Sequence, residues 1–503
     1  MSGRRTRILI TAEGTYPYYP GGVSVWCDQL IQKLPEIDYS VFSITHSPSQ
    51  PLRFKLPRNV VRCTPLALWG TEEPGWCTGD FVNRYNRRLA TTAEVLETKF
   101  AVPFQSVVRE LLSGAAANEQ RLAQGLQQLY RFFQRYDYAA AMESELAWRL
   151  FVVSVIRKLP QAEGPSIEEV TAWMRWLTRY LAVVSVPLPE VDLVHSSFAG
   201  LAGVPGVLAK LEMGSAYLLS EHGIFLRELY LALSRSRETE KNRRFLMNLN
   251  RALVKMNYFH ADTITSLGAF NQMWQLRFGA PAERIVYLPN GVDPSSFAPA
   301  PGKRLERPTV VTMARISPIK GIDTLMRAAV TVKRRIPSAK FRVCGDVADE
   351  NYYKAVLKII EENNLKDSVE FGVTKDVVGA YQQAHVFCLP SNTEGMPYSI
   401  LEAMLCGCPV VATDVGNVAE TVGGTGLVVR PNDPDKLAEA LLYLLDVVDG
   451  ARRRTQLSEL ARHRALTHYT LDQMANRTRD LYGQLLHRSA RQRSACITSP
   501  QFA

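Results

Sequence analysis

Residues 385–417, with the sequence HVFCLPSNTEGMPYSILEAMLCGCPVVATDVGN, predict a strand–loop–helix–strand unit. The apolar run Val386–Leu389 ends in turn-forming residues, and the apolar residues that follow have helical spacing. Cys406 and Gly407 end this helix, and Val410–Thr413 is the next buried strand. Two apolar strands joined through a helix are the building unit of a parallel α/β sheet.

The entrance of this helix carries Gly395 and Pro397, where unpaired backbone N–H groups and the helix dipole favour an anion. Glu394 lies in the loop before the helix and Glu402 about one turn inside it, so both can line the crevice beyond the strand ends. Carboxylates beside an anion site accept hydrogen bonds from neutral hydroxyls. Together these residues indicate a phosphate attached to a polyhydroxylated sugar.

The rest of the second half alternates strands with helices, which predicts a doubly wound sheet with right-handed crossovers. Its other expected strands are Thr309–Met313, Ala339–Cys344, Ser368–Phe371 and Gly426–Val429. Arg315 and Lys320 follow the first of these strands, where two cations can hold a diphosphate and neutralise a leaving phosphate. A solvated surface pair is the alternative.

The first half begins with a strand at Arg7–Glu13, a loop that ends in Gly21 and Gly22, and a helix from Val23. Such a glycine pair lets backbone amides approach a phosphate, although a tight turn alone also explains it. Further strands are expected at Tyr39–Thr45, Val60–Pro65, Asp192–Ser197, Tyr217–His222, Asp262–Leu267 and Ile285–Leu288. His222 ends one of these strands, where a structural role and a place in a ligand site are both open.

Residues of about 70–185 have a helical pattern, which predicts an insertion over the first sheet. The segment Leu226–Lys255 is expected to form one basic helix, either a solvated face or a contact with membrane lipid or an anionic acceptor. The Pro- and Ala-rich segment at 293–308 is the expected domain boundary, and a helical tail follows Gly450.

The composition is that of a globular protein of two or three domains, with 503 residues, 46% hydrophobic and 21% charged. The net charge of +10 suits an anionic ligand, a membrane surface or nucleic acid. Eight cysteines lack metal-ligand spacing. No apolar run is long enough for a signal peptide or a membrane span, so the chain is expected in the cytoplasm, with a peripheral position at the inner face of the cell membrane left open.

The second half resembles the donor-binding domain of the retaining glycosyltransferases of family 4, which have the GT-B fold. The matching segments are ARISPIKG (314–321), SNTEGMPYSILEAM (391–404) and CGCPVVATDVGN (406–417). In the first half, EGTYPYYPGGVSVWCDQL, HSSFAGLAGV, LSEHGIFLRELY, ITSL and LPNGVD are similar to the PelF-like glycosyltransferases of Pel exopolysaccharide synthesis.

This resemblance implies an α/β protein with two Rossmann-like domains facing each other across a cleft. The implied domains are residues 1–300 on the acceptor side, residues 301–465 for the nucleotide sugar, a C-terminal helix at 466–490 that packs back on the first domain, and a disordered tail at 491–503. The implied reaction is metal-independent, front-face transfer of a hexose from a UDP-sugar, UDP-glucose first, to a growing exopolysaccharide or another glycan acceptor. A membrane-bound polysaccharide synthesis complex is an implied partner, and nucleic acid is not.

The resemblance also implies roles for individual residues. Glu402 would bind the ribose hydroxyls and Glu394 the sugar hydroxyls, while His222 would face the sugar. Arg315 and Lys320 would hold the diphosphate. The implied donor-binding set is Gly21, Gly22, Arg315, Lys320, Glu394, Gly395, Met396, Pro397, Tyr398, Ser399 and Glu402.

No metal ligands are expected, because the D-x-D sequence at Asp433 and Asp435 opens a helix, where Asp433 would serve as an N-cap. Two other functions remain open from the residues. A UDP-sugar epimerase on the same scaffold would convert its donor without an acceptor, and a non-catalytic scaffold subunit would bind partners through the basic helix.

Overall fold

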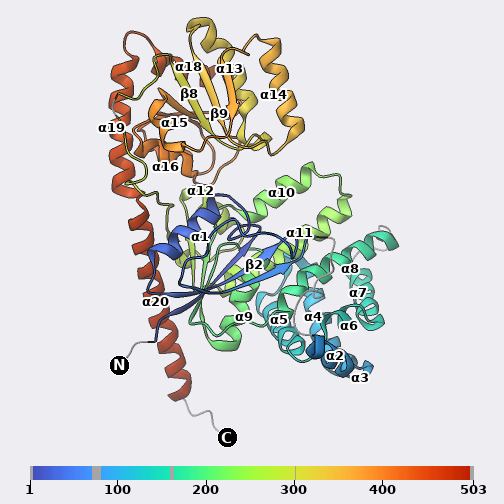
Figure 1. Ribbon diagram of the computed structural model, residues 1–503. Helices are drawn as coiled ribbons and strands as arrows, with labels where there is room; N and C mark the ends of the chain where they lie inside the picture. The colour runs from blue at the N-terminus through green and yellow to red at the C-terminus, as the bar shows by residue number, and fades with distance from the viewer. Residues whose placement is uncertain (1–3, 71–80, 159–163, 301, 499–503) are drawn as a thin grey trace. The chain divides into compact units, whose positions relative to one another are not determined.

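The computed structural model describes residues 4–70, 81–158, 164–300 and 302–498, and it divides them into two compact units (Figure 1). Unit 1 comprises the described residues within Met1–Ser266, Met273–Val286 and Thr478–Ala503. Unit 2 comprises those within Leu267–Gln272 and Tyr287–Arg477. Each unit is built on its own β-sheet with helices on its faces.

The first sheet has seven strands in the order β3-β2-β1-β4-β5-β6-β7. They are β1 (Arg7–Glu13), β2 (Asp38–Thr45), β3 (Val60–Ala67), β4 (Leu193–Ser196), β5 (Ala216–Ser220), β6 (Thr263–Ser266) and β7 (Ile285–Tyr287). Parallel pairing runs from β3 through β6, with Ile8 opposite both Tyr39 and Leu193. The strand order reverses between β1 and β4, and this is where ligand crevices form in parallel sheets.

Helices surround this sheet. They are α1 (Gly22–Lys33), α2 (Phe81–Ala90), α3 (Ala93–Val95), α4 (Ala101–Ser113), α5 (Glu119–Phe133), α6 (Tyr138–Met142), α7 (Glu145–Lys158), α8 (Ile167–Leu181), α9 (Val204–Met213), α10 (Phe225–Arg235) and α11 (Glu240–His260). Helix α12 (Ala269–Arg277) belongs to unit 1 from Met273 onward, and its earlier residues belong to unit 2. Short 3-10 or π-helical turns lie at Leu96–Phe100, Gly114–Ala116, Ala182–Ser185, Leu201–Gly203 and Ala282–Arg284.

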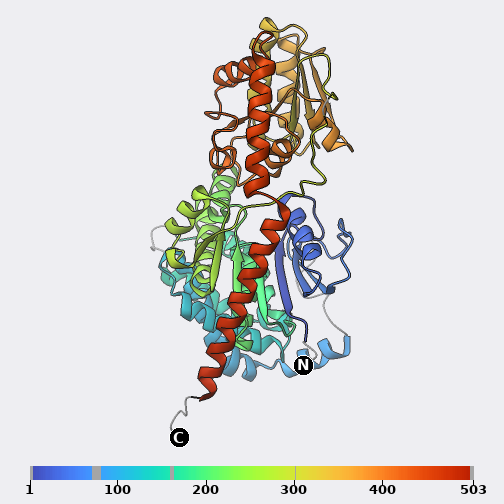
Figure 2. The same ribbon diagram turned by 90° about the vertical axis from the view of Figure 1, so that its left-hand side faces the viewer.

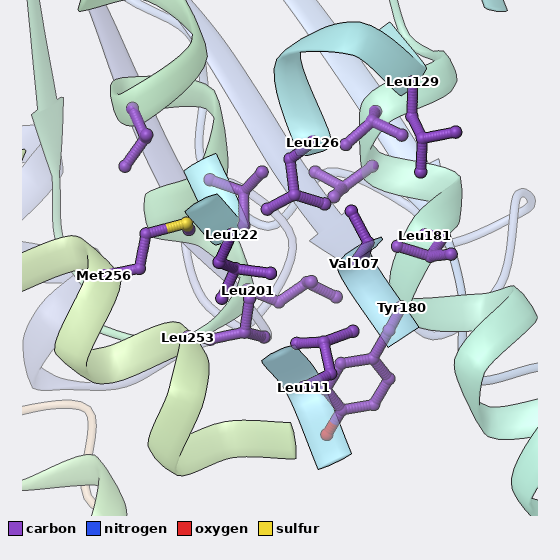
Figure 3. Packing of buried hydrophobic residues seen from close by; sticks show 14 of the residues in the cluster. Val107, Leu111, Leu122, Leu126, Leu129, Tyr180, Leu181, Leu201, Leu253 and Met256 are labelled. Atoms are coloured by element: carbon purple, nitrogen blue, oxygen red, sulfur yellow. The ribbon is translucent and has the colours of Figure 1, made fainter. Parts of the chain in front are cut away.

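The predicted helical insertion corresponds to α2–α8 within the described residues. Its apolar side chains are not a separate core, because one continuous cluster joins them to Phe42 and Ile44 of the sheet. Figure 3 shows Leu122, Leu126 and Leu129 of α5 among side chains from α4, α8 and α11. The insertion is therefore an additional helical layer of unit 1.

The predicted single basic helix at Leu226–Lys255 is wrong, because two helices, α10 and α11, cover this segment. Ser236 is in an extended conformation after α10, and the Thr239 side chain caps α11 by accepting a hydrogen bond from the Asn242 N–H at 3.2 Å. Serine and threonine hydroxyls compete for backbone hydrogen bonds, so they favour a helix end over a helix interior.

The second sheet has six strands in the order β10-β9-β8-β11-β12-β13. They are β8 (Thr309–Met313), β9 (Lys340–Cys344), β10 (Val369–Gly372), β11 (Val386–Leu389), β12 (Val410–Thr413) and β13 (Leu427–Val429). Its neighbouring strands are parallel. The helices of this unit are α13 (Ile322–Arg335), α14 (Glu350–Glu362), α15 (Val377–Gln383), α16 (Tyr398–Leu405), α17 (Val418–Val422), α18 (Pro434–Leu445) and α19 (Gly450–His468), with a 3-10 turn at Pro318–Lys320.

Alternate side chains of β11 serve two separate apolar clusters, one on each face of the second sheet. Val386 and Cys388 belong to the cluster that includes α13 and α18. Phe387 and Leu389 belong to the cluster that includes α16. A strand covered on both faces needs a continuous apolar run, which is why His385–Asn417 can be interpreted from the sequence alone.

The Pro- and Ala-rich segment expected at the domain boundary lies inside unit 2, whose longer segment is Tyr287–Arg477. Val292 explains the difference, because its N–H donates to the Tyr469 carbonyl and its carbonyl accepts from the Leu471 N–H, both at 2.9 Å. These hydrogen bonds attach the residue just before the segment to residues 469 and 471, and sequence spacing does not reveal such long-range contacts.

Helix α20 (Leu471–Thr498) continues the chain, and its residues from Thr478 onward belong to unit 1 (Figure 2). There the Tyr482 hydroxyl lies 2.7 Å from His195 Nδ1, and Arg479 Nε lies 2.8 Å from Glu36 Oε1. The disorder predicted from residue 491 is wrong up to Thr498, because the Arg-, Ala- and Gln-rich sequence favours a helix. Residues 499–503 lie outside the described part of the chain. No described helix has both the length and the apolar content that a membrane span requires.

Candidate functional site

The candidate site of unit 2 lies at the carboxyl ends of β8 and β11, which are adjacent parallel strands. From β8 the sheet continues to β9 on one side, and from β11 it continues to β12 on the other. The strand order therefore reverses between β8 and β11, so the loops after these strands diverge and leave a crevice for a ligand. The sequence segments that carry Arg315 and Glu394 are these two loops.

Hydrogen bonds hold the two loops together. The Asn392 N–H donates to the Ile319 carbonyl at 2.8 Å, and the Asn392 side-chain amide donates to the Pro318 carbonyl at 2.9 Å. Gly321 has a positive φ of 61°, and a Cβ at this position would lie 2.1 Å from the Pro390 carbonyl oxygen. Only glycine permits this approach, which brings the loop after β8 against the loop after β11.

Lys320 and Glu394 form an ion pair at this junction, with 2.6 Å between the lysine Nζ and the glutamate Oε1. The same carboxylate oxygen accepts a hydrogen bond from the Ser391 hydroxyl at 2.6 Å. The two charged side chains are only 18% and 9% exposed. Because water is largely excluded, each charge depends on the other for its stability.

The backbone around Glu394 is tightly positioned. A Cβ at Gly416 would lie 1.9 Å from the Glu394 carbonyl oxygen, and the Asn417 N–H donates to the Gly395 carbonyl at 2.9 Å. The Asn290 side chain donates to the Met396 carbonyl at 3.0 Å. The loop before α16 is therefore held by the loop after β12 and by residue 290.

The N-terminus of α16 presents backbone N–H groups without a side-chain cap. Pro397 is the N-cap residue, and Gly395, Tyr398 and Ser399 are partly buried around it. Glu402 lies inside the helix, where its Oε2 accepts a hydrogen bond from the Tyr381 hydroxyl at 2.8 Å. Burial raises the pKa of Glu402, and the Tyr381 hydrogen bond opposes that shift.

Arg315 lies five residues before Lys320, and its side chain is exposed. The Ile316 N–H donates to the Asp346 carbonyl at 2.8 Å, which attaches this loop to the carboxyl end of β9. The fold thus places Arg315, Lys320 and Glu394 in loops at the carboxyl edge of the second sheet and Glu402 in the helix that follows the second of these loops. It brings Lys320 and Glu394 into direct contact.

The other predicted site residues, Gly21, Gly22 and His222, belong to unit 1. Gly21 is the N-cap of α1, with a φ of 156°, and α1 has neither a side-chain cap nor an acidic residue in its first turn. The His222 ring packs against Trp26 with its centroid 4.4 Å away. These residues follow β1 and β5 at the carboxyl edge of the first sheet.

Several polar residues near these sites were missed by the sequence interpretation. His195 of β4 lies between the Tyr482 and Ser220 hydroxyls, each at 2.7 Å, and burial lowers its pKa to about 3. Burial raises the pKa of both Glu13 and Glu221 to about 7. Both glutamates stand at strand ends, and that position is the one signal in the sequence that could have selected them.

Within the described residues, no group of three or more His, Cys, Asp or Glu side chains could hold a metal ion. Asp433 is an N-cap, as predicted, because its Oδ1 accepts a hydrogen bond from the Lys436 N–H at 2.9 Å. Cys406 and Cys408 are free and buried.

Comparison with known proteins agrees with this architecture. Residues 6–283 match the family described as domain of unknown function DUF3492, and residues 307–447 match the glycosyl transferases group 1. A GDP-mannose-dependent alpha-(1-6)-phosphatidylinositol monomannoside mannosyltransferase of Mycobacterium tuberculosis is 31% identical over 303 residues, which cover 54% of this chain and 74% of that protein.

Two solved structures share the fold along nearly the whole chain. Sucrose-phosphate synthase from Thermosynechococcus elongatus superimposes with a TM-score of 0.61 at 19% identity, covering 96% of this chain and 100% of that one. Anabaena HepE in complex with UDP and glucose superimposes with a TM-score of 0.59 at 15% identity, covering 95% and 100%.

Two Rossmann-like units and a group 1 glycosyltransferase domain define a glycosyltransferase of the GT-B class, an enzyme that uses a nucleotide-sugar donor. The chain belongs to the DUF3492 family, whose domain here precedes the group 1 domain.

Proposed function

We propose that this enzyme transfers a hexose from a UDP-sugar to a glycan acceptor of exopolysaccharide synthesis, with retention of anomeric configuration. UDP-glucose is the first candidate for the donor. The observation that carries the proposal is the shielded Lys320–Glu394 pair at the strand-order reversal of the second sheet. A nucleoside diphosphate sugar offers this pair an anionic diphosphate and, beside it, neutral sugar hydroxyls.

The donor can replace both partners of the ion pair at once. The diphosphate takes the place of the carboxylate beside Lys320, and the sugar hydroxyls donate to Glu394 in place of the ammonium group. Neither shielded charge is then left uncompensated, which is the condition for opening an ion pair that is largely out of water. Ser391 keeps its hydrogen bond to Glu394 and holds the carboxylate in place.

Three further features stabilise the donor in this proposal. The exposed guanidinium group of Arg315 binds the diphosphate in a bidentate manner. The uncapped N-terminus of α16 adds the backbone N–H donors of Gly395, Met396 and Tyr398, since Pro397 has none. Glu402, oriented by Tyr381, accepts hydrogen bonds from the ribose hydroxyls.

In the proposed reaction, the bond between the anomeric carbon and the β-phosphate oxygen breaks, and its electron pair passes to the phosphate. The acceptor hydroxyl oxygen bonds to the anomeric carbon on the face that the phosphate leaves, and its proton passes to the departing phosphate oxygen. Arg315, Lys320 and the end of α16 stabilise the charge that develops on that phosphate, so the transfer is proposed to be metal-independent. His222 of unit 1 is proposed to face the sugar.

A second candidate function differs in the nucleotide sugar that serves as the donor. The mannosyltransferase of Mycobacterium tuberculosis is named as GDP-mannose-dependent, and its identity to this chain favours GDP-mannose as the alternative donor. HepE, whose complex contains UDP and glucose, favours a UDP-sugar through its fold alone. Both donors fit the same diphosphate and hydroxyl contacts.

The test is a panel of UDP- and GDP-sugars, each incubated with and without exopolysaccharide fragments as acceptor, with nucleotide release measured in the presence of a chelator. We expect release from UDP-glucose, with loss of that release in Glu394→Ala. Glu439→Ala serves as the matched control, because Glu439 is an exposed glutamate of α18 that pairs with Lys436. Release of nucleotide from GDP-mannose alone would show that the donor is GDP-mannose and not a UDP-sugar. Release from none of the nucleotide sugars would refute the proposed function.

A further inference from the structure

The helical layer of unit 1 contains a pocket of about 110 Å³ where the C-terminal ends of α4 and α7 meet α8 and the first half of α11. Leu112 and Val155 line it together with the rings of Trp173 and Phe245. The two rings are stacked at an interplanar angle of 6°, with 4.8 Å between their centroids. The Trp173 indole N–H already donates to Asn242 at 2.7 Å, so the indole offers the pocket an apolar ring face.

Three cations, Lys158, Lys241 and Arg244, line the same pocket. Lys158 and Arg244 are exposed, and the Lys241 side chain is 42% exposed. Among the described residues, two acids lie nearby. Glu169 Oε2 is 3.8 Å from Lys241 Nζ, and that carboxylate also accepts hydrogen bonds from the Ser166 N–H and the Thr239 hydroxyl. Glu238 accepts a hydrogen bond from the Asn242 side chain at 2.8 Å. The charged groups that the structure describes, three cations and two carboxylates, leave a net positive charge beside an apolar interior.

The hydrogen bonds that each lysine makes in the fold do not use all of its N–H donors. Lys158 Nζ donates to the Ser113 hydroxyl at 2.8 Å, and Lys241 Nζ donates to the Gly164 carbonyl at 3.0 Å. An ammonium group has three donors. Both lysines can therefore bind an anion without giving up these contacts.

The size of the pocket limits what can enter it. A cavity of roughly 150 Å³ accommodates one benzene ring, so this smaller pocket admits a short hydrocarbon segment and excludes a whole nucleotide or sugar. An anion can stay at the rim, where Arg244 and the lysines can contact it. The matching ligand is an anionic group attached directly to an apolar chain.

We propose that this pocket binds an acidic phospholipid, with the phosphate on Lys158, Lys241 and Arg244 and the adjoining hydrocarbon against Trp173 and Phe245. Apolar side chains on the same helices support the choice of a lipid. Ile156 of α7 is 60% exposed and Ile167 of α8 is 73% exposed, and both are free to enter the interface of a bilayer. The inference is independent of the proposed sugar donor, because it concerns only the helical layer of unit 1.

The experiment measures binding of the full chain to phosphatidylcholine vesicles with and without phosphatidylglycerol. We expect binding that requires phosphatidylglycerol and weakens about fivefold in Arg244→Gln, since each basic residue near an anionic surface contributes about that factor. Arg251→Gln is the matched control, because it removes one exposed arginine from the same helix, two turns along the helix from Arg244, at a position outside the residues that line the pocket. Binding to both vesicle types alike, or equal weakening by both substitutions, would overturn the pocket as the lipid site.

A second measurement separates the lipid from a free phosphate. Calorimetry with monomeric dihexanoyl phosphatidic acid should show binding that Arg244→Gln weakens, with far weaker binding of inorganic phosphate. Equal affinity for the two ligands would show that the hydrocarbon contributes nothing and would contradict the proposal. Circular dichroism of both variants checks the fold, which the exposed positions of Arg244 and Arg251 should leave intact.

Discussion

Lys320 and Glu394 illustrate how one contact can serve both stability and chemistry. Their charged groups are 2.6 Å apart and mostly shielded from water. Removal of one partner leaves the other charge buried alone, whereas replacement of both by apolar side chains removes the desolvation penalty together with the attraction. Stability and activity should therefore respond differently to single and double substitution.

Lys320→Met is expected to lower the free energy of unfolding by about 3 kcal/mol, because it breaks a shielded ion pair. The double variant Lys320→Met/Glu394→Leu should recover most of that loss, yet remain inactive with every nucleotide sugar. Urea unfolding and nucleotide release provide the two readouts. Additive losses of stability would show that the two side chains do not act as a pair.

Glu221 should make stability depend on pH, because burial raises its pKa from 4.5 to about 7 in the folded protein. Between these values the folded state keeps a proton that the unfolded state releases, so the free energy of unfolding falls as the pH rises through this range. Glu221→Gln lacks this dependence, and its stability relative to the wild type should rise by about 3 kcal/mol from pH 4.5 to 7.

His195 contributes to the pH dependence of stability with the opposite sign, and this contribution cancels between the wild type and Glu221→Gln. Burial lowers its pKa from 6.5 to about 3, so the stability it provides is lost as the pH falls below 6.5, but it does so in both proteins. Denaturant unfolding at a series of pH values gives the difference. If the free energy of unfolding changes with pH in the same way for the wild type and Glu221→Gln, the raised pKa of Glu221 is contradicted.

The positions of single residues after the strands were predictable from the sequence, but the side chains that these residues contact were not. Arg315, Lys320 and Glu394 could be selected because each follows a strand of a parallel sheet, where ligand residues gather. Tyr381, which orients Glu402, lies in a different helix, and nothing in its local sequence distinguishes it from a core tyrosine. Such pairings depend on tertiary packing between elements far apart in the chain.

At the scale of elements, Gly416 couples the loop after β12 to the loop that carries Glu394. Its φ of 61° disfavours any side chain, and an added Cβ would meet the Glu394 carbonyl. Gly424 provides a natural comparison, because its φ is 76° but a Cβ there would have nothing within 4 Å. The two glycines share the backbone strain but differ in the steric contact.

We therefore expect Gly416→Ala and Gly424→Ala both to lose at least about 1 kcal/mol of stability from left-handed backbone strain. Only Gly416→Ala should also displace Glu394 and reduce nucleotide-sugar turnover. Melting curves and nucleotide-release rates of the two variants make the comparison. Equal turnover in both would show that the Gly416 contact does not position the site.

Strands were predictable to within about one or two residues at their ends, because a sheet buried on both faces requires continuous apolar runs such as Val386–Leu389 and Val410–Thr413. The ends of helices were harder to predict from the sequence. The break between α10 and α11 depends on the hydroxyl cap of Thr239, and basic composition concealed it. At the C-terminus, α20 continues where charge suggested disorder, since arginine and glutamine also favour helices.

At the scale of the whole molecule, two units with separate sheets divide the predicted site residues between them. Unit 2 holds Arg315, Lys320, Glu394 and Glu402, whereas His222 lies in unit 1. The boundary between the two units could be placed only approximately from the sequence. Backbone hydrogen bonds between Val292 and residues 469 and 471 hold the linker-like segment within unit 2.

Nucleotide binding should be visible in the stability of the intact chain. UDP at 100 times its dissociation constant should stabilise the folded state by about 2.7 kcal/mol and raise the melting temperature. Glu402→Gln should need a higher UDP concentration for the same shift, because it weakens the proposed ribose contact. If neither UDP nor GDP raises the melting temperature, a non-catalytic scaffold is the better description of this chain.

In the proposed reaction, cations at the carboxyl edge of the second sheet stabilise the negative charge of the departing nucleotide. The most direct test is the rate of UDP release from UDP-glucose by the wild type, Arg315→Ala and Arg307→Ala. Arg307 is an exposed arginine before β8, at the opposite end of the strand, and its removal should leave the rate unchanged. We expect Arg315→Ala to lose about 10²–10³-fold in rate, and a rate equal to that of Arg307→Ala would show that Arg315 does not stabilise the departing phosphate.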